Sequence, residues 1–223
     1  YGWNDGSGSA NNQSWSGITA DGQSFTNPLY NNTADAITYG YTGGASLDDS
    51  SCTYPVLNIG DTHAGGIIFY LTGSPGSYSG LVVDTTSYSA TSSGWGCINT
   101  TTGATDTTLG GGLANTNAIL ANCSTLGIAA RVAAQTNTGG YTDWFLPNKE
   151  EWEEIDQTVG VAGTNQLNIG PAYSYWLSTE FSSGQAWAAT FDCNTTYYID
   201  VYNKDETTAN CGGSFAIHPI RAF

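Results

Sequence analysis

Hydrophobic spacing predicts a helix that begins just after Asn148. Trp152, Ile155 and Val159 follow one another at the period of a single helix face. Asn148 suits the N-cap position, and Glu151, three residues later, completes a capping box. We therefore predict an amphipathic helix over 149–159. Its acidic side chains are expected to be solvated on the outer face: Glu150, Glu151, Glu153, Glu154 and Asp156.

The chain from Leu57 onward mixes strand-like and helical patterns. Apolar positions at helical spacing predict helices over 115–122 and 126–135, after a long loop that ends near 113. Short apolar or alternating runs predict strands over 65–72, 80–84, 174–178, 186–192, 197–202 and 214–222. Helices in the middle and strands at both ends indicate an α+β domain with a mixed, mainly antiparallel sheet, in which the last strand returns beside the first.

Residues 1–57 have a different composition, dominated by Gly, Ser, Asn, Thr and Tyr. Such a segment buries little apolar surface by itself. Alternation around Ile37, Tyr39 and Tyr41 favours strand pairing with another chain or packing on the main domain. We expect a β-rich or irregular stalk, linker or assembly segment over 1–57, and a domain that folds alone over 58–223.

Charge excludes some classes of partner. Nineteen acidic residues against four basic ones give a formal net charge of -15, which repels phosphates and anionic lipid headgroups. No apolar run approaches the roughly 20 residues that span a bilayer. We therefore expect neither nucleic-acid binding nor membrane insertion. Only 10% of residues are charged, and the Ser, Thr and Asn content favours an extracellular, cell-surface or virion location.

Residues suited to catalysis are few. His63 and His218 are the only histidines. The position of His63 favours a solvated or capping role, and that of His218 a structural hydrogen bond, over acid–base work. Gly110, Gly111 and Gly112 lack the Lys and Ser/Thr of a phosphate-binding loop. We expect a protein that is not an enzyme and needs no cofactor. Calcium stays open, because four aspartates lie in loops rich in carbonyl oxygens: Asp48, Asp49, Asp61 and Asp106.

The five cysteines lack the spacing of zinc or redox motifs. We predict a disulfide between Cys97 and Cys123 and a second between Cys193 and Cys211, each closing a polar loop. Cys52 is then free or intermolecular. The alternative is that these residues are buried free thiols.

Seven motifs occur in the order of one known family. They read GGIIFYL at 65–71, WGC at 95–97, NTNAILANC at 115–123, TDWFLPNKEEW at 142–152, YWLSTE at 175–180, AW at 186–187 and IRAF at 220–223. Together they resemble the collagen-like adhesin C-terminal domain family. The resemblance implies a C-type-lectin-like fold of the kind found in bacterial adhesins, phage fibres and hypervariable ligand-binding proteins.

The resemblance also assigns expected roles to single residues. It implies that the tryptophans inside the motifs pack in the core. Asp143 and Arg221 also lie in motifs, and in a chain with so few cations an ion pair between them would be structural. The family often carries a further cysteine where this chain has Ala133, which leaves the pairing of Cys97 and Cys123 open. The motif tryptophans are Trp95, Trp144, Trp176 and Trp187.

A candidate ligand surface lies in the segment that hypervariable members of that family diversify. If Ile199 and Val201 point inward, strand alternation turns the residues between them outward as one stripe. Tyrosine and acidic or amide side chains suit recognition surfaces. The alternative is an ordinary polar edge strand with a solvated loop. The candidate ligand-binding residues are Asp192, Asn194, Tyr198, Asp200, Tyr202, Asn203 and Asp205.

These observations predict an extracellular or virion-associated recognition domain. Its expected partner is a host or cell-surface glycan or protein, and the chain is expected to form a homo-oligomer or part of a fibre. An alternative is a structural subunit or decoration of an extracellular fibre or phage particle. An enzyme of the related formylglycine-generating fold is disfavoured, because the redox cysteine pattern of that group is absent.

Overall fold

The computed structural model describes two parts of the chain. The chain divides into compact units, Tyr1–Pro55 and Val56–Phe223. In the first unit the structure describes the backbone of β1 (Trp15–Ile18) and β2 (Ser24–Asn27), an antiparallel pair, and the last two residues, Tyr54 and Pro55. The other described residues are 54–89, 94–169, 173–191, 197–209 and 213–223. Independent folding of 58–223 stays a prediction.

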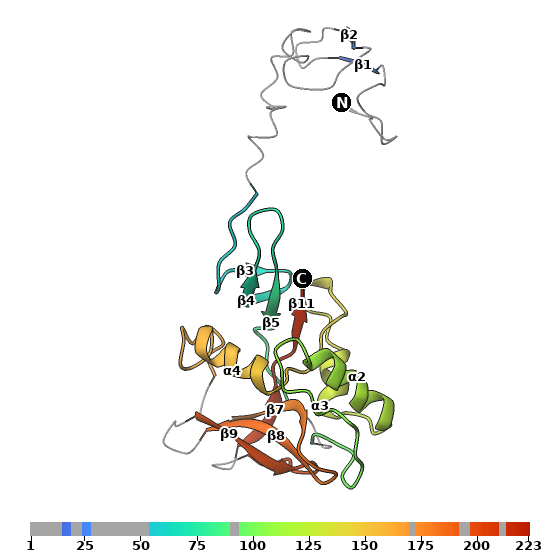
Figure 1. Cartoon of the computed structure of the whole chain (residues 1–223), viewed down its shortest axis with the longest axis vertical. Helices are drawn as coiled ribbons and strands as arrows, with labels where there is room; N and C mark the ends of the chain where they lie inside the picture. Colours follow the sequence, from blue (N-terminus) through green and yellow to red (C-terminus); the bar gives the residue numbers. More distant parts are fainter. Residues whose placement is uncertain are drawn as a thin grey trace. The chain divides into compact units, whose positions relative to one another are not determined.

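Within the second unit the described residues form an α+β domain with two sheets, as the pattern of elements predicts (Figure 1). The smaller sheet has the order β11-β5-β4-β3, all antiparallel. The larger has the order β6-β10-β7-β8-β9, in which only the β10–β7 pairing is parallel. The strands are β3 (Thr62–His63), β4 (Gly66–Thr72), β5 (Ser79–Val83), β6 (Tyr88–Ser89), β7 (Tyr173–Glu180), β8 (Gln185–Phe191), β9 (Tyr197–Asn203), β10 (Ser214–Ile217) and β11 (Ile220–Ala222).

The helices are α2 (Gly112–Asn122), α3 (Ala129–Ala134) and α4 (Lys149–Thr158), with a 3-10 turn, η3 (Thr138–Gly140). The capping box of α4 is confirmed. The Glu151 N–H donates to Asn148 Oδ1 at 3.0 Å, and the Asn148 N–H donates to Glu151 Oε2 at 2.7 Å. Helix α2 begins three residues earlier than predicted, and α3 is shorter than predicted.

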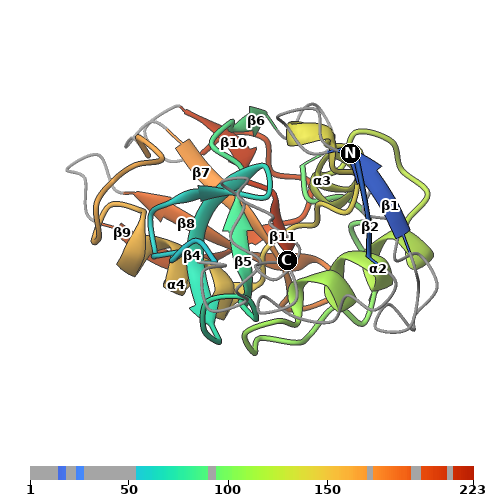
Figure 2. The same cartoon turned by 90° about the horizontal axis from the view of Figure 1, so that it is seen from above.

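The larger sheet is covered on both faces, because α4 and the smaller sheet lie on one side and α2 and α3 on the other (Figure 2). The first core joins α4 to β4, β5 and alternate residues of β7 and β8, including Trp152, Phe69 and Leu177. The second core includes Trp95 and Trp176. The buried apolar residues of β7 and β8 therefore alternate between the two apolar layers.

The C-terminal strand differs from the prediction. The expected strand 214–222 is two strands that join different sheets, with His218 and Pro219 between them. The final strand β11 pairs with β5 and not with β4, so the expectation that the last strand lies beside the first is wrong. The break has a local cause, because Pro219 has no N–H to donate to a ladder.

Two acidic residues of α4 are buried, so the prediction of a solvated acidic face is wrong for them. Glu151 has no exposed surface and accepts the N–H groups of Gly110 and Gly112. Asp156 is 2% exposed and accepts the N–H groups of Val161 and Ala162. Both carboxylates satisfy backbone donors of loops that fold back onto the helix.

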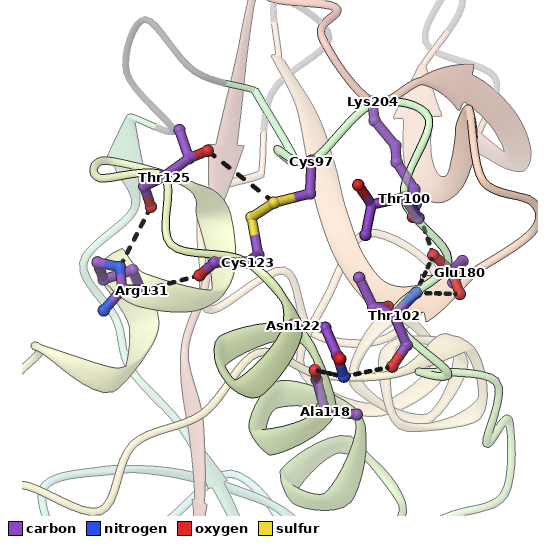
Figure 3. The surroundings of a disulfide bond; sticks show 10 residues. All are labelled: Cys97, Thr100, Thr102, Ala118, Asn122, Cys123, Thr125, Arg131, Glu180 and Lys204. Atoms are coloured by element: carbon purple, nitrogen blue, oxygen red, sulfur yellow. Dashed lines mark hydrogen bonds and ion pairs between the residues drawn. A yellow bond between two sulfur atoms is a disulfide. The ribbon is translucent and has the colours of Figure 1, made fainter.

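The long loop after β6 is joined to α2 by a disulfide and to the larger sheet by hydrogen bonds to an ion pair (Figure 3). Cys97 and Cys123 are bonded, as predicted, which joins the loop to the end of α2. The buried carboxylate of Glu180, at the end of β7, accepts the N–H of Thr102 and pairs with the ammonium of Lys204, just after β9. The ends of β7 and β9 are thereby fixed beside this loop.

The motif residues mostly have the roles implied by the resemblance. Arg221 forms a two-pronged ion pair with Asp143, in which Nε lies 2.8 Å from Oδ1 and Nη2 lies 3.0 Å from Oδ2. Trp95, Trp144 and Trp176 are buried. The fourth motif tryptophan is different, as described below.

Candidate functional site

The predicted outward stripe lies on β9, the edge strand of the larger sheet within the described residues. Asp200 is exposed, whereas Tyr198 and Tyr202 are half-buried. The Tyr202 ring packs perpendicular to Phe215, with centroids 5.2 Å apart, and also contacts Trp176 edge-on. The predicted outward orientation of Tyr202 is therefore wrong. The face of β9 that carries Tyr202 is the one covered by α2 and α3, so the ring packs against the second core.

The other predicted ligand residues are dispersed. Asn203 is exposed at the end of β9, on the face opposite to Tyr202, and Asp205 is exposed in the following turn. Asp192 and Asn194 lie outside the described residues. The same holds for the predicted Cys193–Cys211 disulfide and for Cys52, which stay predictions.

The opposite face of the β8–β9 ribbon presents a partly exposed tryptophan. Trp187 lies across from Val201 in the ladder. It packs against the first core, as expected, but it is only half-buried. Phe181 packs perpendicular to Trp187 with centroids 5.6 Å apart, and 56% of its surface is exposed. The Lys149 Nζ lies 4.6 Å from the centroid of the Trp187 ring.

Two amide side chains complete this surface. Gln185, at the start of β8, is the cross-strand partner of Asn203, at the end of β9. Both lie on the Trp187 side of the ribbon, since residues two apart along a strand share a face. We call this surface the Trp187 patch and define it by Lys149, Phe181, Gln185, Trp187, Val201 and Asn203.

Local hydrogen bonds explain why these residues meet. The N–H groups of Phe181 and Ser182 donate to the Gln185 carbonyl, each at 3.0 Å, which closes the turn between β7 and β8. The Lys149 N–H donates to Thr179 Oγ1 at 3.2 Å, which holds the first residue of α4 beside the end of β7. The helix start and the hairpin turn therefore bracket the Trp187 ring.

The chemistry of the Trp187 patch suits binding. Its aromatic rings offer rigid apolar area, and its amides can donate and accept hydrogen bonds. Of its members, only Asn203 is among the residues predicted to bind ligand. Sequence reasoning missed Phe181 and Gln185. The sequence shows that both residues lie next to the YWLSTE and AW motifs. Their placement around Trp187 depends on how the turn folds and on the start of α4, which is distant in sequence.

The histidines have structural surroundings. The buried ring of His218 is bound through Nδ1 to the Asp84 carbonyl at 2.9 Å, and burial lowers its pKa. This bears out the expectation of a structural hydrogen bond. The His63 ring packs edge-on to Phe223 at 4.6 Å between centroids.

Glu151 accepts the N–H groups of the glycine run at 110–112. Burial raises the pKa of Glu151 to about 7, although its oxygens accept three backbone N–H groups, those of Asn148, Gly110 and Gly112. The donors of this run therefore bind an internal carboxylate.

Metal-ligating side chains do not gather in the described part of the chain. No three His, Cys, Asp or Glu residues there are placed to hold an ion. Asp61 accepts the N–H of Asn58, and Asp106 accepts the N–H and hydroxyl of Thr108. The aspartates Asp48 and Asp49 lie outside the described residues.

Comparison with protein families, curated proteins and solved structures gives no significant match. The geometry of the described residues therefore defines the class, an α+β domain whose edge ribbon carries an aromatic and amide surface. Among its described helices, none has the length and apolar character needed to cross a membrane.

Proposed function

We propose that this chain is an extracellular or virion-associated recognition domain that binds a glycan or a surface protein. The observation that carries the proposal is the Trp187 patch. There, Phe181 and Trp187 present ring surface to solvent on the same face as Gln185 and Asn203, which are cross-strand partners. Binding sites for polar ligands commonly combine aromatic rings, which stack on the ligand, with amides, which hydrogen-bond to its hydroxyls.

The position of the patch supports the proposal. The ribbon is fixed at one end by the buried pair of Lys204 and Glu180, so its side chains are held on rigid strands. A preorganised surface loses less freedom when it binds. The exposed carboxylate of Asp200, on the other face of the same ribbon, adds a second polar contact for a large ligand.

The experiment is a glycan array probed with the full chain and with two variants of the patch, Phe181→Ala and Asn203→Ala. Leu126→Ala is the matched control, because Leu126 is an exposed apolar residue, 76% exposed, in the connection between α2 and α3. The proposal expects binding that both patch variants weaken and the control leaves unchanged. Equal binding by all variants would remove the patch from the function.

A structural subunit of a fibre or particle is the second candidate. The observation that favours it is the edge position of β9, because edge strands present backbone groups that pair with other chains. Filament formation by the full chain, seen by electron microscopy, would support this candidate. A chain that stays monomeric at high concentration would count against it.

A further inference from the structure

The basic side chains are few enough to account for one by one. The chain has four, and all lie among the described residues. Lys204 donates to Glu180 Oε1 at 2.5 Å and to the Thr100 carbonyl at 2.7 Å. Arg221 is paired with Asp143. Arg131 donates to the carbonyls of Cys123 and Thr125, at 3.0 and 3.2 Å.

The fourth cation, Lys149, is different. Its ammonium lies over the Trp187 ring, and no carboxylate of the described residues forms an ion pair with it. This is unexpected in a chain with nineteen acidic residues. No hydrogen bond among the described residues engages the ammonium either, so its N–H donors that point away from the ring stay available to a ligand.

The acids nearest to Lys149 in sequence are engaged elsewhere. Glu150 accepts the N–H of Leu109 at 3.1 Å. Glu151 accepts backbone N–H groups of the glycine run and of Asn148. The helix start thus directs its own carboxylates onto the backbone and leaves the ammonium of Lys149 in the patch.

We propose that the Trp187 patch binds a carboxylate-bearing sugar, such as a uronic or sialic acid unit of a glycan. Lys149 contacts the carboxylate, Phe181 packs against the sugar ring, and Gln185 and Asn203 bind its hydroxyls. A charge-assisted hydrogen bond to an ammonium is about twice as strong as a neutral one. This inference rests on the proposed recognition function and names the ligand class for the same site.

The net charge of -15 does not prevent this contact. Repulsion between exposed charges is largely screened beyond a Debye length of about 8 Å at physiological ionic strength. At contact distance the ammonium acts on the carboxylate directly. The acidic surroundings instead disfavour ligands with many closely spaced anionic groups, and so favour a glycan with isolated carboxylates.

The test is an array on which each carboxylate glycan, ending in glucuronate, galacturonate or sialate, stands beside its methyl ester. The ester keeps the ring and the hydroxyls and removes the charge. The full chain is compared with Lys149→Gln and Lys149→Arg. We expect the unmodified chain to bind at least one acid about tenfold more tightly than its ester. We expect Lys149→Gln to bind the acid and its ester with equal affinity, and Lys149→Arg to retain the preference for the acid.

Two results would overturn the inference. Only the second would also count against glycan binding as the proposed function. If acids and esters bind equally, and Phe181→Ala still weakens binding, the recognition function stands and the carboxylate inference fails. If no glycan on the array binds, the inference fails together with the glycan form of the proposed function.

Discussion

Lys204 and Glu180 form a buried ion pair that joins the residue after β9 to the end of β7, with Nζ 2.5 Å from Oε1. Each partner is further satisfied. Glu180 accepts the N–H groups of Thr102 and Gly103, and the ammonium of Lys204 lies 4.6 Å from the centroid of the Trp95 ring. The pair therefore fixes the long loop and the ribbon to one another.

Replacing Lys204 with Met should lower the free energy of unfolding by about 3–5 kcal/mol, because the carboxylate of Glu180 stays buried without its counter-charge. Urea denaturation measures the change. The matched control is Lys149→Met at a half-exposed lysine, which should cost less than about 1 kcal/mol. Adding Glu180→Gln to Lys204→Met should recover part of the loss. Fully additive losses in the double variant would contradict the coupling.

Glu151 should make stability depend on pH. Its pKa is raised by burial from 4.5 to about 7 in the folded chain, so the folded state holds a proton that the unfolded state releases. Its contribution to stability is therefore greatest below pH 4.5 and declines as pH rises toward 7. The pH dependence of melting temperature, compared between the unmodified chain and Glu151→Gln, isolates this contribution.

The glutamine variant should also be less stable at every pH, by about 1–3 kcal/mol, because its NH2 group faces a backbone N–H that the carboxylate accepts. The difference in stability between the two proteins should narrow as pH rises from 5 to 7. A difference that is constant with pH would show that Glu151 does not titrate in this range.

The disulfide between Cys97 and Cys123 should stabilise the domain by about 3 kcal/mol, since it closes a loop with a sequence separation of 26. Replacing both cysteines with Ala should lower the free energy of unfolding by that amount. Adding a reductant to the unmodified chain should produce a similar loss at this bond. Denaturation that is insensitive to both treatments would contradict the prediction.

Tyr202 and Asp200 share a face of β9 but should respond differently to substitution. Tyr202→Ala removes a ring that packs on Phe215 and should cost about 2 kcal/mol. Asp200→Ala changes an exposed side chain and should cost less than about 1 kcal/mol. Thermal melting of the two variants measures both costs. If both variants lose equally little stability, the Tyr202 ring points outward as first predicted.

Features fixed by near neighbours could be predicted from the sequence. The capping box depends only on Asn148 and Glu151, which are three residues apart. Helix α4 begins at Lys149, where this motif predicts. Strand alternation correctly separates the faces of β9. It does not tell which face is covered, because that depends on α2 and α3. For this reason the orientation of Tyr202 was predicted incorrectly.

Contacts between distant segments explain the other differences. Glu151 lies on what looks like the polar face of a helix, yet Gly110 and Gly112 come from about forty residues away to cover it. Trp187 sits in a motif, yet it is only half-buried, beside the first residue of α4. Neither arrangement leaves a local signal in the sequence.

The proposed recognition function is tested most directly by titration calorimetry, which measures how strongly the full chain and its Phe181→Ala variant bind a glycan identified on the array. Phe181 is exposed, so its loss should leave the melting temperature nearly unchanged while weakening binding by about 1–3 kcal/mol. Leu126→Ala should bind as the unmodified chain does. Unchanged affinity of Phe181→Ala, with an unchanged fold, would contradict a binding site at the Trp187 patch.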